Sequence, residues 1–124
     1  ERADHLLEFV GLYEKRMLKS GDLSFAQQKL LEFAMALMNE PTCLLLDEPT
    51  AGINPTLING LIDRLKRANS EFGITLFVIE HNMRVIMNMA EKIYCLAHGE
   101  MLAEGTPDEI QNDQRVIDAY LGAH

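Results

Sequence analysis

Residues 43–49 have the sequence Cys-Leu-Leu-Leu-Asp-Glu-Pro, in which an unbroken apolar run is followed by two acids and a proline. A short apolar run of this kind, preceded here by Pro41, is typical of a strand buried on both faces of a parallel sheet. Residues 75–79 form a second such run, and residues 55–72 between them carry apolar side chains at helical spacing. The order strand, helix, strand predicts an α/β fold with a partly parallel sheet flanked by helices.

The same patterns predict further elements on either side of this unit. They are a helix over residues 2–13, a helix over residues 27–38 that is capped by Ser24, a helix over residues 83–90, a hairpin of strands 92–97 and 100–104 joined at His98-Gly99, and a helical, acidic tail from Thr106 to Leu121.

The composition is that of a globular protein, because 48% of the 124 residues are hydrophobic. The 19 acidic residues outnumber the 11 Lys and Arg residues and give a net charge of −8, which argues against a nucleic-acid-binding protein. No apolar run approaches the ~18 residues that a membrane span requires. Cys43 and Cys95 both lie in apolar runs, which predicts two reduced, buried thiols.

Acidic and imidazole side chains follow the two predicted buried strands, and in α/β folds ligands bind at this end of the strands. Asp47 and Glu48 are adjacent, so one of them can hold a hydrated Mg²⁺ while the other accepts a proton from an attacking water. His81 can reach the same site because neighbouring strands lie about 5 Å apart. The simpler alternatives are an acid pair on a solvated edge and a histidine that merely ends a strand.

A helix N-terminus is predicted at Ser24, and its backbone N–H groups and hydroxyl are suited to binding an anion. The alternative is that Ser24 only caps the helix. Asn54 has a comparable alternative, because asparagine is a common turn residue.

Four segments together resemble the ATPase subunits of ABC transporters. Leu23–Lys29 resembles the signature loop, Leu44–Pro49 the Walker B strand with its glutamate, Ala51–Pro55 the D-loop, and Val78–His81 the loop that carries the switch histidine. The segments occur in the order and spacing of the family, and the resemblance covers essentially the whole chain. The Ala-Gly-Ile-Asn-Pro form and the ending Val116–Gly122 are most similar to subunits of branched-chain amino acid and urea importers.

The resemblance implies roles for the residues at the strand ends. Asp47 would hold the Mg²⁺ shell, Glu48 would polarise the attacking water, and His81 would contact the γ-phosphate of ATP. Mg²⁺ and ATP are the cofactors that the family implies.

The resemblance also implies that the signature segment acts across a dimer of two ATPase subunits stacked head to tail. Ser24 and the backbone N–H groups of Phe25, Ala26 and Gln27 would bind the γ-phosphate of a nucleotide held by the opposite subunit. Asn54 would communicate across the dimer interface. The family normally has glycine where this chain has Phe25 and Ala26, so the Ala26 methyl group is expected to intrude and to restrict a positive φ.

The sequence contains no P-loop, which requires Gly-x-x-x-x-Gly-Lys followed by Ser or Thr. The chain is therefore expected to be the C-terminal half of an ABC ATPase. In that half, residues 1–40 belong to the helical signature subdomain, and residues 41–124 contain the Walker B strand, the D-loop, the switch histidine and the C-terminal helices. The isolated chain is expected neither to bind ATP tightly nor to hydrolyse it.

The function implied is hydrolysis of Mg-ATP coupled to import of amino acids or a similar small solute. The implied partners are the missing N-terminal half, a second ATPase subunit and transmembrane permease subunits at the inner face of the cell membrane, with no nucleic acid. The alternative is a non-enzymatic module that dimerises or acts in trans. In the family the P-loop strand lies beside the strand that corresponds to residues 75–79. Without it this strand would have an unpaired edge, which favours a homo-oligomer or direct pairing with residues 92–97.

Overall fold

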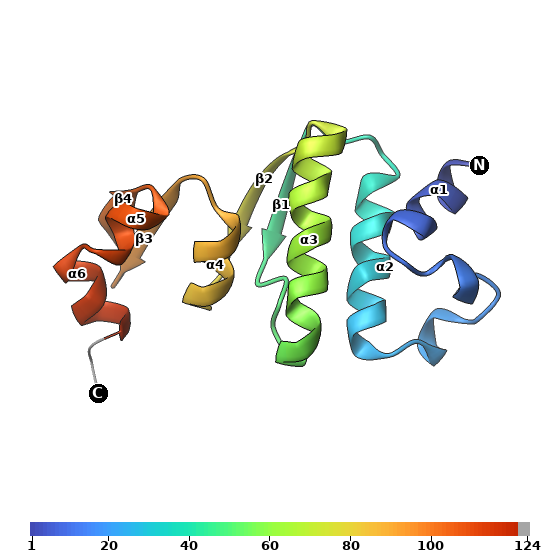
Figure 1. Cartoon of the computed structure of the whole chain (residues 1–124), viewed down its shortest axis with the longest axis horizontal. Coiled ribbons are helices and arrows are strands. Elements are labelled where there is room, and N and C mark those ends of the chain that lie inside the picture. The colour runs from blue at the N-terminus through green and yellow to red at the C-terminus, as the bar shows by residue number, and fades with distance from the viewer. Residues whose placement is uncertain (122–124) are drawn as a thin grey trace. The chain divides into compact units, whose positions relative to one another are not determined.

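The computed structural model describes residues 1–121 of the chain, so Gly122 lies outside the described residues. These residues form two compact units, which divide between His81 and Asn82. In chain order the elements are α1 (Arg2–Phe9), helical turns over Tyr13–Lys15 and Ser20–Asp22, α2 (Phe25–Leu37), β1 (Cys43–Asp47), α3 (Pro55–Phe72), β2 (Thr75–Ile79), α4 (Met83–Met89), β3 (Ile93–Ala97), β4 (Glu100–Gly105), α5 (Pro107–Gln111), α6 (Gln114–Val116) and a π-helical turn over Ile117–Leu121 (Figure 1).

The predicted parallel pair is confirmed in the first unit, where β1 and β2 are paired from Cys43 opposite Thr75 to Asp47 opposite Ile79. Both strands therefore end at the same edge of the sheet. Within residues 1–121 the two sheets are β1–β2 and the antiparallel β3–β4 pair.

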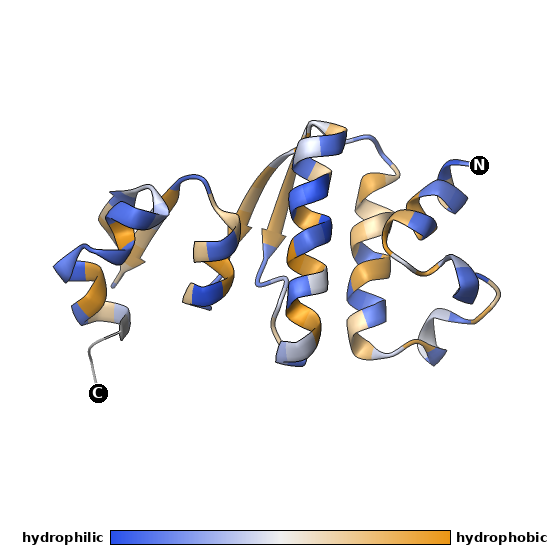
Figure 2. Cartoon of the chain, viewed as in Figure 1, coloured by the Kyte–Doolittle hydropathy of each residue, from blue (hydrophilic) through white to orange (hydrophobic). Residues whose placement is uncertain are grey.

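Helix α3 connects the two parallel strands, and its ends are set by local chemistry. The Asn54 side chain accepts a hydrogen bond from the Thr56 N–H at 3.0 Å, and Pro55 occupies the first turn. Gly73 ends the helix in the left-handed conformation at φ 67°. Figure 2 shows hydrophobic and hydrophilic segments alternating along this helix. Its buried residues follow helical spacing and are Leu61, Ile62, Leu65 and Ala68.

The expectation that both strands are buried on both faces is wrong. Alternate residues of β1 and β2 are half-buried, while the others are exposed. We call the exposed apolar side the outer face; it comprises Cys43, Leu45, Phe77 and Ile79, and Leu45 has 74% of its surface exposed. The strands are coloured as hydrophobic in Figure 2. Successive side chains of a strand point to opposite faces, and the described residues of this unit cover only one of them.

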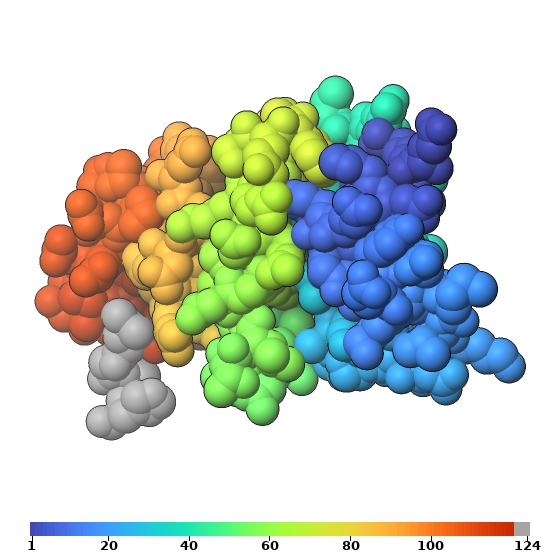
Figure 3. All heavy atoms as spheres, turned by 45° about the vertical axis from the view of Figure 1, so that its right-hand side comes forward, coloured from blue at the N-terminus to red at the C-terminus, as the bar shows by residue number. Residues whose placement is uncertain are grey.

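Helices α1 and α2 pack beside α3 in the same unit. The Arg2 guanidinium donates to the Leu37 carbonyl at 2.8 Å and to the Met38 carbonyl at 3.2 Å, which ties α1 to the end of α2. The Phe9 ring lies 4.8 Å from the Phe72 ring between centroids, so α1 also contacts α3, as the adjoining blue and green atoms in Figure 3 show.

The predicted boundaries of these helices need two corrections. The first helix ends at Phe9 instead of residue 13, and Gly11 follows it at φ 77°, outside helical backbone geometry. The second helix begins at Phe25, two residues earlier than expected, because a capping box at Ser24 starts it.

The second unit is built on the predicted hairpin of β3 and β4. His98 and Gly99 join the strands with φ values of 52° and 78°, as the two central residues of a type I′ turn require. The expected helical tail is divided into α5, α6 and the π-helical turn, and a capping box between Thr106 and Glu109 starts α5. The Tyr120 hydroxyl donates a hydrogen bond to the Leu96 carbonyl, which ties the last turn to β3.

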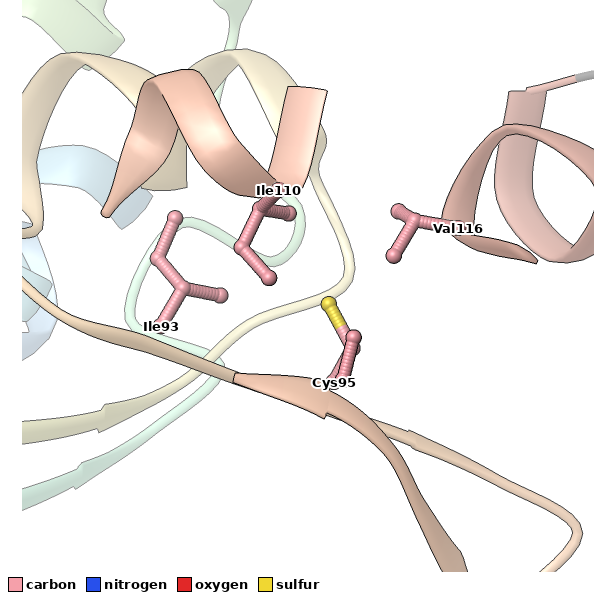
Figure 4. Packing of buried hydrophobic residues seen from close by; sticks show 5 residues of the cluster. Ile93, Cys95, Ile110 and Val116 are labelled. Atoms are coloured by element: carbon pink, nitrogen blue, oxygen red, sulfur yellow. The ribbon is translucent and has the colours of Figure 1, made fainter. Parts of the chain in front are cut away.

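A small apolar core holds the second unit together (Figure 4). Its buried members are Ile93, Cys95, Ala103, Ile110 and Val116. Cys95 is therefore buried as predicted, whereas Cys43 is exposed on the outer face, so the prediction of two buried thiols is wrong for Cys43. None of the helices within residues 1–121 is long and apolar enough to cross a membrane.

The two thiols are expected to react at different rates with iodoacetamide. Burial, with a smaller contribution from the Asp113 charge, raises the pKa of the Cys95 thiol. A raised pKa lowers the thiolate fraction at a given pH, and the thiolate is the nucleophile. At pH 8 Cys43 should be alkylated at least about 10-fold faster than Cys95, as measured by peptide mass mapping, and unfolding in urea should abolish the difference. Equal rates in the folded chain would contradict the described burial.

Candidate active site

The two parallel strands end beside each other, which brings the segments after them together. The Glu48 N–H donates to the Ile79 carbonyl at 2.7 Å, one residue beyond the end of β1. Glu48 and His81 thus follow neighbouring strand ends, as the sequence predicts from the two apolar runs.

Glu48 and His81 are in direct contact. The Glu48 Oε1 atom lies 2.8 Å from His81 Nδ1, and the two side chains are 47% and 73% exposed, so solvent reaches both. An ionised carboxylate can only accept hydrogen bonds, so this contact assigns a proton to Nδ1. A carboxylate and an oriented imidazole at the open edge of a sheet are suited to activating water.

Glu48 adopts a backbone conformation that is unusual for its residue type. Its φ is 48°, in the left-handed region, which costs an L-residue roughly 1–2 kcal/mol. Among residues 1–121, the other non-glycine residues with positive φ are Glu40 and His98. Since strained backbone is often found at functional sites, this conformation supports assigning Glu48 to the candidate site.

Asp47 is the last residue of β1 and is exposed. Residues 1–121 contain no group of three or more His, Cys, Asp or Glu side chains suited to a metal ion. Mg²⁺ in phosphate-transfer sites is usually held by one or two carboxylates, with waters and phosphate oxygens completing its octahedron. A single exposed carboxylate at a strand end therefore fits the donor set expected for Mg²⁺ with a bound phosphate.

The Ser24 and Gln27 side chains cap α2. Ser24 Oγ accepts a hydrogen bond from the Gln27 N–H at 3.2 Å, and Gln27 Oε1 accepts one from the Ser24 N–H at 2.9 Å. Ser24 therefore caps the helix, as the sequence predicts, and this cap is compatible with anion binding by the first turn. Asn54 is likewise a capping residue, because its Oδ1 accepts from the Thr56 N–H and hydroxyl.

The start of α2 fixes the backbone conformation of Ala26. Phe25 and Ala26 are the first two residues of this helix, and neither has a positive φ. The expectation that alanine restricts a positive φ here is therefore wrong, because right-handed helical geometry suits alanine. The expected intrusion of the Ala26 methyl group on a bound phosphate stays a prediction.

Phe25 makes a contact that the sequence does not reveal. Its ring lies against Gly52, where an added Cβ would be 3.1 Å from the ring, and Gly52 itself has a φ of 76°. Lys29 Nζ lies 5.4 Å from the centroid of the same ring, within the range of a cation–π interaction. The start of α2 therefore packs on the loop that leads from Glu48 to Asn54.

Sequence reasoning missed a second pair, Thr50 and Glu80. The Thr50 hydroxyl donates to Glu80 Oε2 at 2.6 Å, and Thr50 is 5% exposed. Glu80 directly precedes His81 in the sequence, but no role was predicted for it. The two residues are 30 positions apart, so no local pattern links them, and the only signal is that each lies within two residues of Glu48 or His81.

Two family models match the chain. One is described as ABC transporter and matches residues 1–51; the other is described as branched-chain amino acid ATP-binding cassette transporter and matches residues 100–124. The high-affinity branched-chain amino acid transport ATP-binding protein BraF of Pseudomonas aeruginosa is 40% identical over 98% of this chain and 48% of its own length. The chain is a homologue of ABC-transporter ATP-binding subunits. LivG of Escherichia coli K12 is 37% identical over the same shares, so the chain spans about half the length of the curated relatives it matches.

Solved structures confirm the predicted ABC ATPase fold. An ATP-binding cassette of an ABC transporter in its ADP conformation matches 98% of this chain and 49% of its own length, with a TM-score of 0.87 and 32% identity. A nucleotide-free cassette from an ABC transporter matches the same shares, with a TM-score of 0.86 and 34% identity.

The left-handed backbone at Glu48 predicts that a glycine variant is more stable than an alanine variant, the reverse of the order at a helical position. Glu48→Gly should be about 1 kcal/mol more stable than Glu48→Ala, because only alanine retains the cost of positive φ. Both variants lose the carboxylate, so the lost contact with His81 cancels in the comparison. The free energy of unfolding in urea gives the measurement.

The matched control is Glu32, an exposed residue in α2. There alanine should be the more stable replacement, by up to about 1 kcal/mol. The same order at both positions would rule out the left-handed conformation of Glu48.

Proposed function

We propose that this chain is the C-terminal portion of an ABC-transporter ATPase subunit, with Glu48 and His81 as its hydrolytic pair. The observation that supports the proposal is the 2.8 Å contact between these side chains at the open edge of a parallel sheet. We propose that the complete protein couples hydrolysis of Mg-ATP to import of amino acids or a similar small solute. Relatives named as branched-chain amino acid transport ATP-binding proteins support this reaction.

The proposed chemistry follows from the protonation of the pair. Glu48 accepts a proton from, or polarises, the water that attacks the γ-phosphate. Because His81 donates Nδ1–H to Glu48, its Nε2 carries a hydrogen only in the imidazolium form, and only that form can donate to a phosphate oxygen. Asp47 would hold Mg²⁺, which supplies charge neutralisation to the phosphates when bound.

The signature segment would serve the nucleotide of a second subunit. The Ser24 and Gln27 side chains are occupied in the capping box, so we assign the phosphate contact mainly to the first-turn N–H groups of α2, which include those of Phe25 and Ala26. Asn54 would lie at the interface between the two subunits. In this proposal residues 1–40 belong to the helical subdomain and residues 41–124 to the catalytic core.

The outer face is proposed to receive the N-terminal half of the ATPase. Parallel sheets are normally covered on both faces, and two strands alone are marginally stable. Leu45, Phe77 and Ile79 are each more than half exposed, and the relatives are about twice as long as this chain. The N-terminal half would cover this face and supply the P-loop that the sequence lacks. Permease subunits would hold the complete ATPase at the cytoplasmic side of the cell membrane.

The second candidate function is a non-enzymatic module that dimerises or acts in trans. The same exposed outer face favours it, because a second copy of the chain would bury Leu45 and Phe77 as well. In that case the chain would form a homo-oligomer and would not need a P-loop.

Phosphate release tests the catalytic proposal. The chain alone should release no phosphate from Mg-ATP, whereas a mixture with the P-loop-containing N-terminal half of BraF should hydrolyse it. Glu48→Gln should lower the rate at least about 100-fold, because general-base catalysis is lost. The control is Glu91→Gln, an exposed acid of the second unit, which should leave the rate unchanged. A mixture that is no more active than either half would overturn the proposal.

Association tests the role of the outer face. Phe77→Lys should weaken binding of the N-terminal half by at least about 10-fold in calorimetry, because a charge would be buried at the interface. Met17→Lys is the control, since Met17 is 88% exposed and is not part of either strand of this sheet. If the unmixed chain is instead a dimer that Phe77→Lys dissociates in ultracentrifugation, the second candidate function is favoured.

A further inference from the structure

A buried carboxylate lies beside the Glu48–His81 contact and has no part in the proposed chemistry. The Glu80 side chain is only 1% exposed, whereas the side chain of the next residue, His81, is 73% exposed. Burying a carboxylate is costly unless hydrogen bonds compensate for its lost hydration. The environment of Glu80 therefore requires an explanation.

Both carboxylate oxygens of Glu80 accept hydrogen bonds from the segments that carry the candidate pair. Oε2 accepts from the Thr50 hydroxyl at 2.6 Å and from the Thr50 N–H at 3.4 Å. Oε1 accepts from the His81 N–H at 3.1 Å. Thr50 is itself 5% exposed, so its hydroxyl is held in this contact away from water.

The loop after β1 is hydrogen-bonded to the end of β2 at two points. One is the bond from the Glu48 N–H to the Ile79 carbonyl, and the other is the bond from the Thr50 hydroxyl to Glu80, two residues further along the loop. Glu48 thus has its left-handed backbone held from both sides. Strained residues persist only where their surroundings fix them, and here the surroundings are these bonds.

Glu80 does not fit the role of a second base. Its carboxylate is buried, so it cannot meet an attacking water. Its Oε1 lies 3.9 Å from His81 Nδ1, beyond hydrogen-bond distance, whereas Glu48 Oε1 lies at 2.8 Å from the same atom. The imidazole is therefore hydrogen-bonded to Glu48, and Glu80 acts on it through the backbone.

We propose that Glu80 is a positioning residue, which holds Glu48 and His81 in contact by accepting hydrogen bonds from the Thr50 hydroxyl and the His81 N–H. Its importance for hydrolysis rests on the proposed function above. The contact itself lies within this chain, so it can be tested without hydrolysis.

The first test uses nitrogen-15 NMR of the 124-residue chain at fixed pH, because the His81 Nδ1 signal reports the proton donated to Glu48. Glu48→Ala defines the signal without the contact. Thr50→Val removes the hydroxyl but keeps the side-chain shape, and Glu80→Gln replaces one acceptor oxygen with a donor. Both should move the Nδ1 signal toward that of Glu48→Ala, and Thr50→Ser, which keeps the hydroxyl, should restore it.

A wild-type Nδ1 signal in Thr50→Val or in folded Glu80→Gln would overturn the inference. Circular dichroism shows whether each variant is folded. If Glu80→Gln does not fold, the comparison of Thr50→Val with Thr50→Ser decides alone, because serine keeps the hydroxyl that donates to Glu80 and valine lacks it.

The second test measures the kinetics of the chain mixed with the N-terminal half of BraF. Thr50→Val should lower kcat about 10-fold or more with KM for ATP unchanged, since misplaced catalytic groups slow the chemical step. Thr50→Ser should recover most of the rate. An unchanged kcat in Thr50→Val would overturn the positioning role in catalysis. If the wild-type mixture has no activity, the proposed function fails, and the NMR result still decides whether Glu80 holds the contact.

Discussion

The register of the parallel pair β1–β2 places Glu48 beside His81. With Asp47 opposite Ile79, the next residues on each strand emerge at one edge, and the bond from the Glu48 N–H to the Ile79 carbonyl extends the pairing into the site. A slip of one residue would turn each side chain to the other face and would separate the carboxylate from the imidazole. The burial of α3 against one face of the sheet therefore matters for the site, because it specifies which residues of the strands face inward.

The site also shows how a protein holds an unfavourable backbone conformation. The left-handed φ of Glu48 costs roughly 1–2 kcal/mol, and a typical hydrogen bond contributes about 1 kcal/mol net. The bonds made by the Glu48 N–H, the Thr50 hydroxyl and the His81 N–H are together of the size needed to offset it. The Phe25 ring adds a contact on the same loop at Gly52, where a larger residue would not fit without movement of the ring.

The sequence predicted those features that depend on local composition. The apolar runs predicted β1 and β2, the helical spacing predicted α3, and the positions of Glu48 and His81 after the strands predicted that they meet. The exposure of Cys43 was not predictable, because the composition of a strand does not show whether a second layer packs on it. The pairs Thr50–Glu80 and Phe25–Gly52 were not predictable either, because each joins residues far apart in sequence through tertiary contacts.

The outer face has a consequence for how long the chain survives in a cell. A partner that binds the native state and not the unfolded chain stabilises it by an amount that grows with the logarithm of the partner concentration. The melting temperature of this chain would then depend on the concentration of that partner as well as on its own sequence. A chain made in excess of whatever covers Leu45 and Phe77 would open more often and be degraded first, so proteolysis would keep the two components in balance.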